Sequence, residues 1–104
     1  MKTEESVLRD VVRALRQVYD PEIPVNVYDL GLIYDLKIDE DHKVFIEMTL
    51  TAPNCPMADK LLEDVHEAVM DTPGVTDVAL KLVFEPEWDK SRMSEVARIE
   101  LGLD

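Results

Sequence analysis

The order in which two hydrophobic periodicities alternate along the chain is the feature that most constrains its fold. Apolar residues first repeat with a helical period between Thr3 and Tyr19. Two strands with alternating apolar and polar residues follow, over Leu32–Ile38 and Val44–Leu50. A second helical stripe begins at Met57, and a third strand is predicted over Val75–Phe84. The predicted order of elements is therefore α-β-β-α-β.

This order predicts an α/β (α+β) fold, a two-layer sandwich with both helices packed on one face of a three-stranded sheet. The polar turn Asp39–Lys43 is short, so the first two strands are expected to form an antiparallel hairpin. After the third strand, a C-terminal tail contains a short helical stretch around Met93–Leu101. The length of 104 residues predicts one domain, residues 1–104.

Charge and composition exclude several classes of function. Asp and Glu number 23 against 11 Lys and Arg, so the net charge is −12. An acidic excess of this size argues against nucleic acid or an anionic membrane as the main partner. No N-terminal signal segment and no apolar run of membrane-spanning length is visible, so the expected location is the cytoplasm.

Cys55 is the most informative single residue. It directly precedes Pro56, which suits the first position of a helix, so the thiol is expected at a helix N-terminus. The helix dipole there lowers a thiol pKa and favours the thiolate. A reactive or ligating role and a buried structural role remain equal alternatives from position alone. Because the chain has one Cys, an intrachain disulfide and a self-contained Cys-rich metal site are excluded.

Polar residues on two loops are the candidates to assist this thiol. Thr49 and Thr51 lead from the second strand into the Cys55 loop, although ordinary strand threonines are the simpler interpretation. Asp20 and Glu22 flank Pro21, and paired carboxylates can bind metal or move protons. Helix termination and a local turn are the favoured explanation on sequence alone. Asp29 is interpreted in the same way.

The remaining polar and aromatic candidates have simpler structural explanations. His42 lies in the hairpin turn, and His66 lies about 16 Å along its helix from Cys55 at 1.5 Å per residue. Neither is expected to share a metal with the thiol. The basic stripe on the first helix predicts a solvated face, with a partner contact as the alternative; it consists of Arg9, Arg13 and Arg16. Trp88 is expected to cover an open edge of the core.

Four sequence pieces, taken together, resemble the SufT/PaaD-like family of metal–sulfur cluster biosynthesis proteins. The pieces are Asp20-Pro21-Glu22-Ile23-Pro24, Asp29-Leu30-Gly31-Leu32-Ile33-Tyr34, Thr49-Leu50-Thr51 followed by Cys55-Pro56, and Pro86-Glu87-Trp88. The resemblance extends from about Val7 to Gly102. Family members often carry two prolines before the tryptophan, whereas here Glu87 takes the second position.

The resemblance implies a non-enzymatic factor for iron–sulfur cluster assembly, transfer or protein maturation. It implies Cys55 as the cluster, metal or thiol residue, with Asp20 and Glu22 as carboxylate ligands and with Thr49, Thr51 and Asp29 in support. The implied cofactor is iron or an iron–sulfur cluster, bound transiently and absent from the isolated protein. The implied partners are other assembly proteins and recipient apo-proteins, and a homodimer is left open.

One chain supplies one thiolate, whereas a cluster commonly takes four, so a bound cluster is expected to bridge two polypeptides. Two other functions compete with this interpretation. A small thiol enzyme would use Cys55 with Thr51 and Asp20. A KH-like RNA-binding module has the same element order, but the chain lacks its GXXG loop and its basic charge.

Overall fold

The computed structural model describes residues 3–21, 23–51 and 58–102. Its elements are α1 (Glu4–Leu15), β1 (Ile33–Ile38), β2 (Lys43–Met48), α2 (Ala58–Met70), β3 (Asp77–Leu82), the 3-10 helix η1 (Lys90–Arg92) and α3 (Glu95–Glu100). The predicted α-β-β-α-β order and the short helix of the tail are confirmed.

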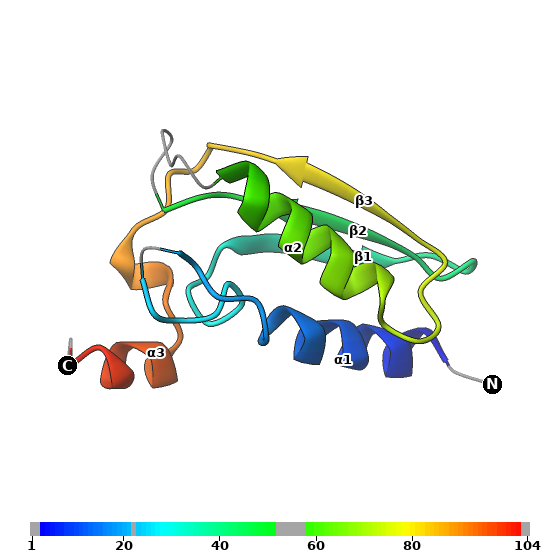
Figure 1. Cartoon of the computed structure of the whole chain (residues 1–104), viewed down its shortest axis with the longest axis horizontal. Coiled ribbons are helices and arrows are strands. Elements are labelled where there is room, and N and C mark those ends of the chain that lie inside the picture. The colour runs from blue at the N-terminus through cyan, green and yellow to red at the C-terminus, as the bar shows by residue number, and fades with distance from the viewer. Residues whose placement is uncertain (1–2, 22, 52–57, 103–104) are drawn as a thin grey trace.

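The three strands form one mixed sheet in the order β1-β2-β3. β1 and β2 pair antiparallel, as the hairpin prediction requires, and β2 and β3 pair parallel. A parallel pair needs a long crossover, and α2 provides it. Both α1 and α2 lie on the same face of the sheet (Figure 1). The predicted two-layer architecture is therefore confirmed.

The core lies between the sheet and the two helices. Each helix buries one stripe: Val7, Val11 and Leu15 from α1, and Leu61, Val65 and Val69 from α2. The predicted apolar face of the second strand is buried against them; it consists of Val44, Ile46, Met48 and Leu50. The hydrophobic periodicity therefore identified the faces that form the core.

The first helix is shorter than its periodicity predicts. It begins at the expected Thr3 cap, whose side-chain oxygen accepts from the Ser6 N–H at 3.0 Å. It ends at Leu15, not at Tyr19, because the following residues pair with a returning segment: the Val27 N–H donates to the Val18 carbonyl at 2.8 Å. Tyr19 is 59% exposed, so its assignment to the buried stripe was wrong.

A β-bulge changes the phase of the first strand. Ile33 lies opposite Met48 and Asp35 lies opposite Glu47, so Tyr34 is the extra residue between them. Strict alternation from Leu32 to Ile38 predicts Tyr34 on the apolar face and Ile33 on the opposite one. The bulge makes that prediction wrong, because Ile33 packs against the core. The third strand is also shorter than predicted, because it ends at Leu82, and Phe84 is 45% exposed.

One end of the molecule collects most of the irregular structure. The loop after α1, the ends of β2 and β3, and the tail after β3 meet at the left in Figure 1, whereas the β1–β2 turn lies at the opposite end. Asp20 and Asp29 belong to the loop after α1, and Thr49 and Thr51 follow β2, so these predicted site residues lie on segments that meet at this end. Among the described residues, no helix is both long and apolar enough to span a membrane.

Candidate functional site

A pocket of about 240 Å³ lies where β2 ends and the tail crosses it. Thr49 and Thr51 line it from the β2 side, and Glu85, Glu87 and Trp88 line it from the tail. Thr49 is 1% exposed, whereas Thr51 is half-buried. The two threonines predicted as supporting residues therefore lie in one pocket with two carboxylates and an indole.

The tail is fixed over this end of the sheet by hydrogen bonds. The Trp88 Nε1–H donates to the Leu30 carbonyl at 2.6 Å, and the Tyr34 hydroxyl donates to the Pro86 carbonyl at 2.8 Å. The Arg92 guanidinium carbon lies 4.7 Å from the centre of the Tyr34 ring. Trp88 packs against the core cluster. These contacts hold the pocket wall against β1.

Gly31 permits the closest approach of the tail to the loop. Its φ is +80°, a backbone conformation that residues other than glycine rarely adopt. A Cβ built at this position would overlap the Arg92 carbonyl oxygen. Close by, the Ser94 N–H donates to the Asp29 carbonyl at 2.7 Å. Gly31 therefore lets the tail approach the loop, and the backbone carbonyls of Asp29 and Leu30 accept hydrogen bonds from the tail.

Asp29 itself has a structural environment. The Asn26 side-chain amide donates to Asp29 Oδ2 at 2.8 Å, and the Asp29 N–H donates to Asn26 Oδ1 at 2.9 Å. Arg16 Nε lies 3.9 Å from Asp29 Oδ1. This reciprocal pair closes the loop before Gly31, so these contacts explain Asp29 without a ligand.

Asp20 is buried, at 6% exposure, and its Oδ1 accepts from the Ile23 N–H at 3.0 Å. This is the local turn that the structural alternative predicted. Glu22 lies outside the described residues, so the predicted pairing of the two carboxylates stays a prediction. Asp20 therefore has at least a turn-forming role.

The loop that carries Asp20 lies against the first turns of α2. Tyr19 and Pro21 line a hollow of about 130 Å³ together with Lys60, Leu61 and Asp64. Cys55, the predicted central residue, lies outside the described residues, as does its predicted helix start at Pro56. The described residues on either side of that segment are Thr51, in the pocket, and Ala58, at the start of α2. Convergence of Cys55 with Asp20 and Thr51 stays a prediction.

Neither histidine lies in the pocket. His42 is in the turn between β1 and β2, where its Nδ1 lies 3.1 Å from the Gly74 carbonyl oxygen. His66 is exposed on α2. Across residues 3–21, 23–51 and 58–102, no group of three His, Cys, Asp or Glu residues is arranged to hold a metal ion.

Sequence reasoning missed the two glutamates of the pocket. Glu85 and Glu87 flank Pro86 shortly after β3, and this spacing was the available signal.

Asp89, the next acidic residue of the tail, is the N-cap of η1. Hydrogen bonds from the Ser91 hydroxyl and the Ser91 backbone N–H, together with the Arg92 charge, lower the pKa of Asp89.

Comparison with known proteins identifies the family. The family model described as "Iron-sulfur cluster assembly protein" matches residues 8–81. The chain is 58% identical to the "Fe-S protein maturation auxiliary factor" of Porphyromonas gingivalis, over 98% of this chain and 93% of that protein. It is 41% identical to the Bacillus subtilis auxiliary factor YitW, over 96% of this chain and 98% of that protein. The chain belongs to the iron–sulfur cluster assembly protein family.

A solved structure agrees with this assignment. The domain of unknown function DUF59 from Bacillus anthracis has a TM-score of 0.87 and 37% sequence identity, covering 96% of this chain and 95% of that one. The SufT-like resemblance and the fold that it implied are therefore confirmed.

Proposed function

We propose that this protein is an accessory factor that assembles iron–sulfur clusters or transfers them to recipient apo-proteins, with the Cys55 thiolate as its sulfur ligand. The observation that carries the proposal is family membership combined with a single cysteine in 104 residues. Relatives of this chain are named as maturation auxiliary factors for Fe-S proteins. We place the action in the cytoplasm, where a lone thiol stays reduced.

The described pocket supports this proposal through its chemistry. Thr51 lines it and directly precedes the segment that contains Cys55, and Glu85 and Glu87 add carboxylate oxygens to the same wall. Thiolates are preferred by iron–sulfur units, and oxygen ligands bind them more weakly. One thiolate with oxygen neighbours makes an exchangeable site, which suits transfer better than storage.

A cluster bound in this way is shared between two polypeptides. The second chain is another copy or a recipient, and it supplies the thiolates that this chain lacks. Because the site is incomplete alone, we expect the isolated protein to carry no cluster. The role is that of a carrier or scaffold and not of an enzyme with turnover.

Anaerobic reconstitution with iron and sulfide tests the proposal. Size-exclusion chromatography with in-line visible absorbance should place the cluster colour with a species larger than the monomer. Cys55→Ser should abolish the colour, while the free energy of unfolding changes by less than about 0.5 kcal/mol, because Ser is itself a good helix cap. His42→Ala and His66→Ala are the matched controls and should retain the cluster.

Three results would contradict this proposal. Colour that travels with a monomer free of small thiols would refute the bridging model. Colour retained in Cys55→Ser would remove the thiolate from the site. Multiple turnover of a thioester substrate by the wild type, lost in Cys55→Ser, would favour the thiol-enzyme alternative.

A further inference from the structure

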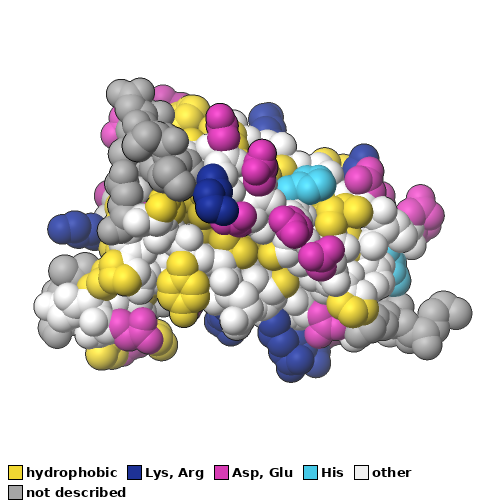
Figure 2. Space-filling view, in the orientation of Figure 1, with side chains coloured by type: hydrophobic (Ala, Val, Ile, Leu, Met, Phe, Trp, Pro, Cys, Tyr) yellow, Lys and Arg dark blue, Asp and Glu magenta, His cyan; other side chains and the backbone are white. Residues whose placement is uncertain are grey.

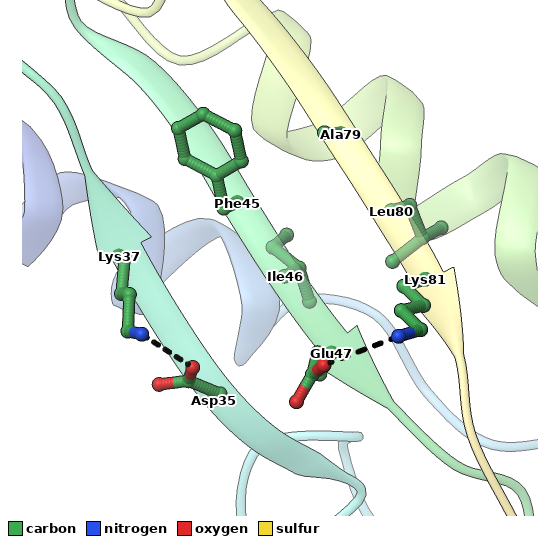
Figure 3. Close-up of a pocket in the computed structure, with 8 residues that line it drawn as sticks. All are labelled: Asp35, Lys37, Phe45, Ile46, Glu47, Ala79, Leu80 and Lys81. Carbon is green, nitrogen blue, oxygen red and sulfur yellow. Dashed lines mark ion pairs between the residues drawn. The ribbon is translucent and has the colours of Figure 1, made fainter.

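The face of the sheet opposite the helices carries a regular pattern of side chains. Figure 3 shows it, with α1 and α2 behind the strands. On this outer face, three alternate residues of β2 lie beside three alternate residues of β3 in the parallel register: Lys43 beside Asp77, Phe45 beside Ala79, and Glu47 beside Lys81. β1 adds Asp35 and Lys37 on its other side.

The outer face is electrically neutral in a strongly acidic protein. Its charges form three ion pairs: Lys37 with Asp35 at 3.3 Å, Lys43 with Asp77 at 3.8 Å, and Lys81 with Glu47 at 3.9 Å. The net charge of −12 is therefore carried elsewhere. On the opposite side, acidic side chains gather over α2 (Figure 2). Two copies of this chain repel each other least when they meet through the outer face.

The centre of this face has a projection next to a depression. Phe45 is 40% exposed on the central strand, and its β3 neighbour is the small Ala79. Both line a hollow of about 370 Å³. Neighbouring strands lie about 4.8 Å apart, so the ring and the depression are side by side. A single exposed aromatic side chain within a polar rim has the composition of an interface centre.

We infer that the protein forms a two-fold symmetric dimer through this outer face. A two-fold axis that runs along the strands, midway between β2 and β3, places β2 of one copy against β3 of the other. Phe45 then faces Ala79 of the second copy. In the same arrangement Lys43 faces the second copy's Asp77, and Glu47 faces its Lys81. Because the axis exchanges the two strands, every contact occurs twice, as in an isologous interface.

The size of the face determines how tight this dimer is. Six-residue strands are about 20 Å long, and three strands make a narrow patch. The area of such a patch is smaller than the roughly 800 Å² that each partner buries in a standard stable interface. We therefore expect a weak dimer whose population depends on protein concentration. The inference does not rest on the proposed function, since it uses none of the residues that line the pocket between Thr49 and the tail.

An exchange of the two central side chains tests the geometry. Sedimentation velocity of the apo-protein from about 5 to 500 µM, a range that covers weak association, should show the wild type shifting from monomer to dimer. Phe45→Ala removes the projection, and Ala79→Phe fills the depression, so each single variant should weaken dimerisation at least tenfold. The double variant F45A/A79F restores a projection facing a depression and should recover the dimer.

The matched control is Ile99→Ala, which removes an apolar side chain that is 61% exposed on α3, away from the sheet. It should dimerise like the wild type. Circular dichroism and thermal unfolding establish that each variant folds. A wild type that stays monomeric throughout overturns the inference. A dimer unaffected by both single variants overturns it too, as does a folded double variant that fails to recover.

Discussion

The outer face of the sheet is covered by the tail at one end and is open at the other. Outward-facing residues along β2 are therefore buried at the covered end and exposed at the open end. At the open half, Phe45 and Glu47 of β2 project outward. Thr49, just after the end of β2, is the next residue in this alternation, yet it is buried. Its N–H still pairs with the sheet side of the loop by donating to the Leu32 carbonyl at 2.9 Å. The difference comes from the tail, which crosses the sheet only at the Thr49 end. A polar strand residue therefore becomes part of a pocket because of a segment about 40 residues later in the sequence.

Replacing Trp88, which holds the tail over the Thr49 end of the sheet, is expected to have the largest effect on stability. Trp88→Ala loses the packing of the ring against the core and the hydrogen bond to the Leu30 carbonyl. We expect the free energy of unfolding to fall by about 3 kcal/mol, the lower end of the range for Trp→Ala, because Trp88 is only half-buried. Urea unfolding at low protein concentration measures this loss.

Phe45→Ala is the matched control on the open half. It removes an aromatic ring that is 40% exposed, so it should cost less than about 1 kcal/mol in the monomer. Equal losses for Trp88→Ala and Phe45→Ala would mean that the tail does not distinguish the two halves.

A smaller effect is expected where the loop approaches the tail. Gly31→Ala combines an unfavourable φ of +80° with overlap of the new Cβ and the Arg92 carbonyl oxygen. These two costs predict a loss of about 2 kcal/mol in the free energy of unfolding. Gly102→Ala is the matched control, because its φ is +71° but nothing lies within 4 Å of the new Cβ. It should cost about 1 kcal/mol, and an equal cost at both glycines would exclude the steric contribution.

The contrast between local structure and structure set by a distant segment also explains which features the sequence could predict. Local periodicity identified both helices, the hairpin and the buried face of β2, because these depend on residues close in the chain. It failed at Tyr34 and Tyr19, where pairing with another segment overrides the period. Thr49 and Thr51 follow a strand with a clear period, so the sequence could place them at its end, where both line the pocket. Glu85 and Glu87 were missed, because only the path of the tail brings them to the same pocket.

The smallest effect concerns the cap that starts η1 in the tail. Hydrogen bonds from the Ser91 hydroxyl and backbone N–H, and the Arg92 charge, lower the pKa of Asp89 in the folded protein below its ordinary value. A lowered folded pKa means that the ionised carboxylate stabilises the fold above the unfolded pKa, and that this contribution disappears as the pH falls through the folded value. Asp89→Asn keeps a capping oxygen but does not titrate. The stability difference between the wild type and Asp89→Asn should therefore be constant from pH 7 to about 5 and shrink below about pH 4. Paired urea titrations at each pH measure it, and a difference that does not change down to pH 2 would show that the Asp89 charge does not contribute to the stability of the fold.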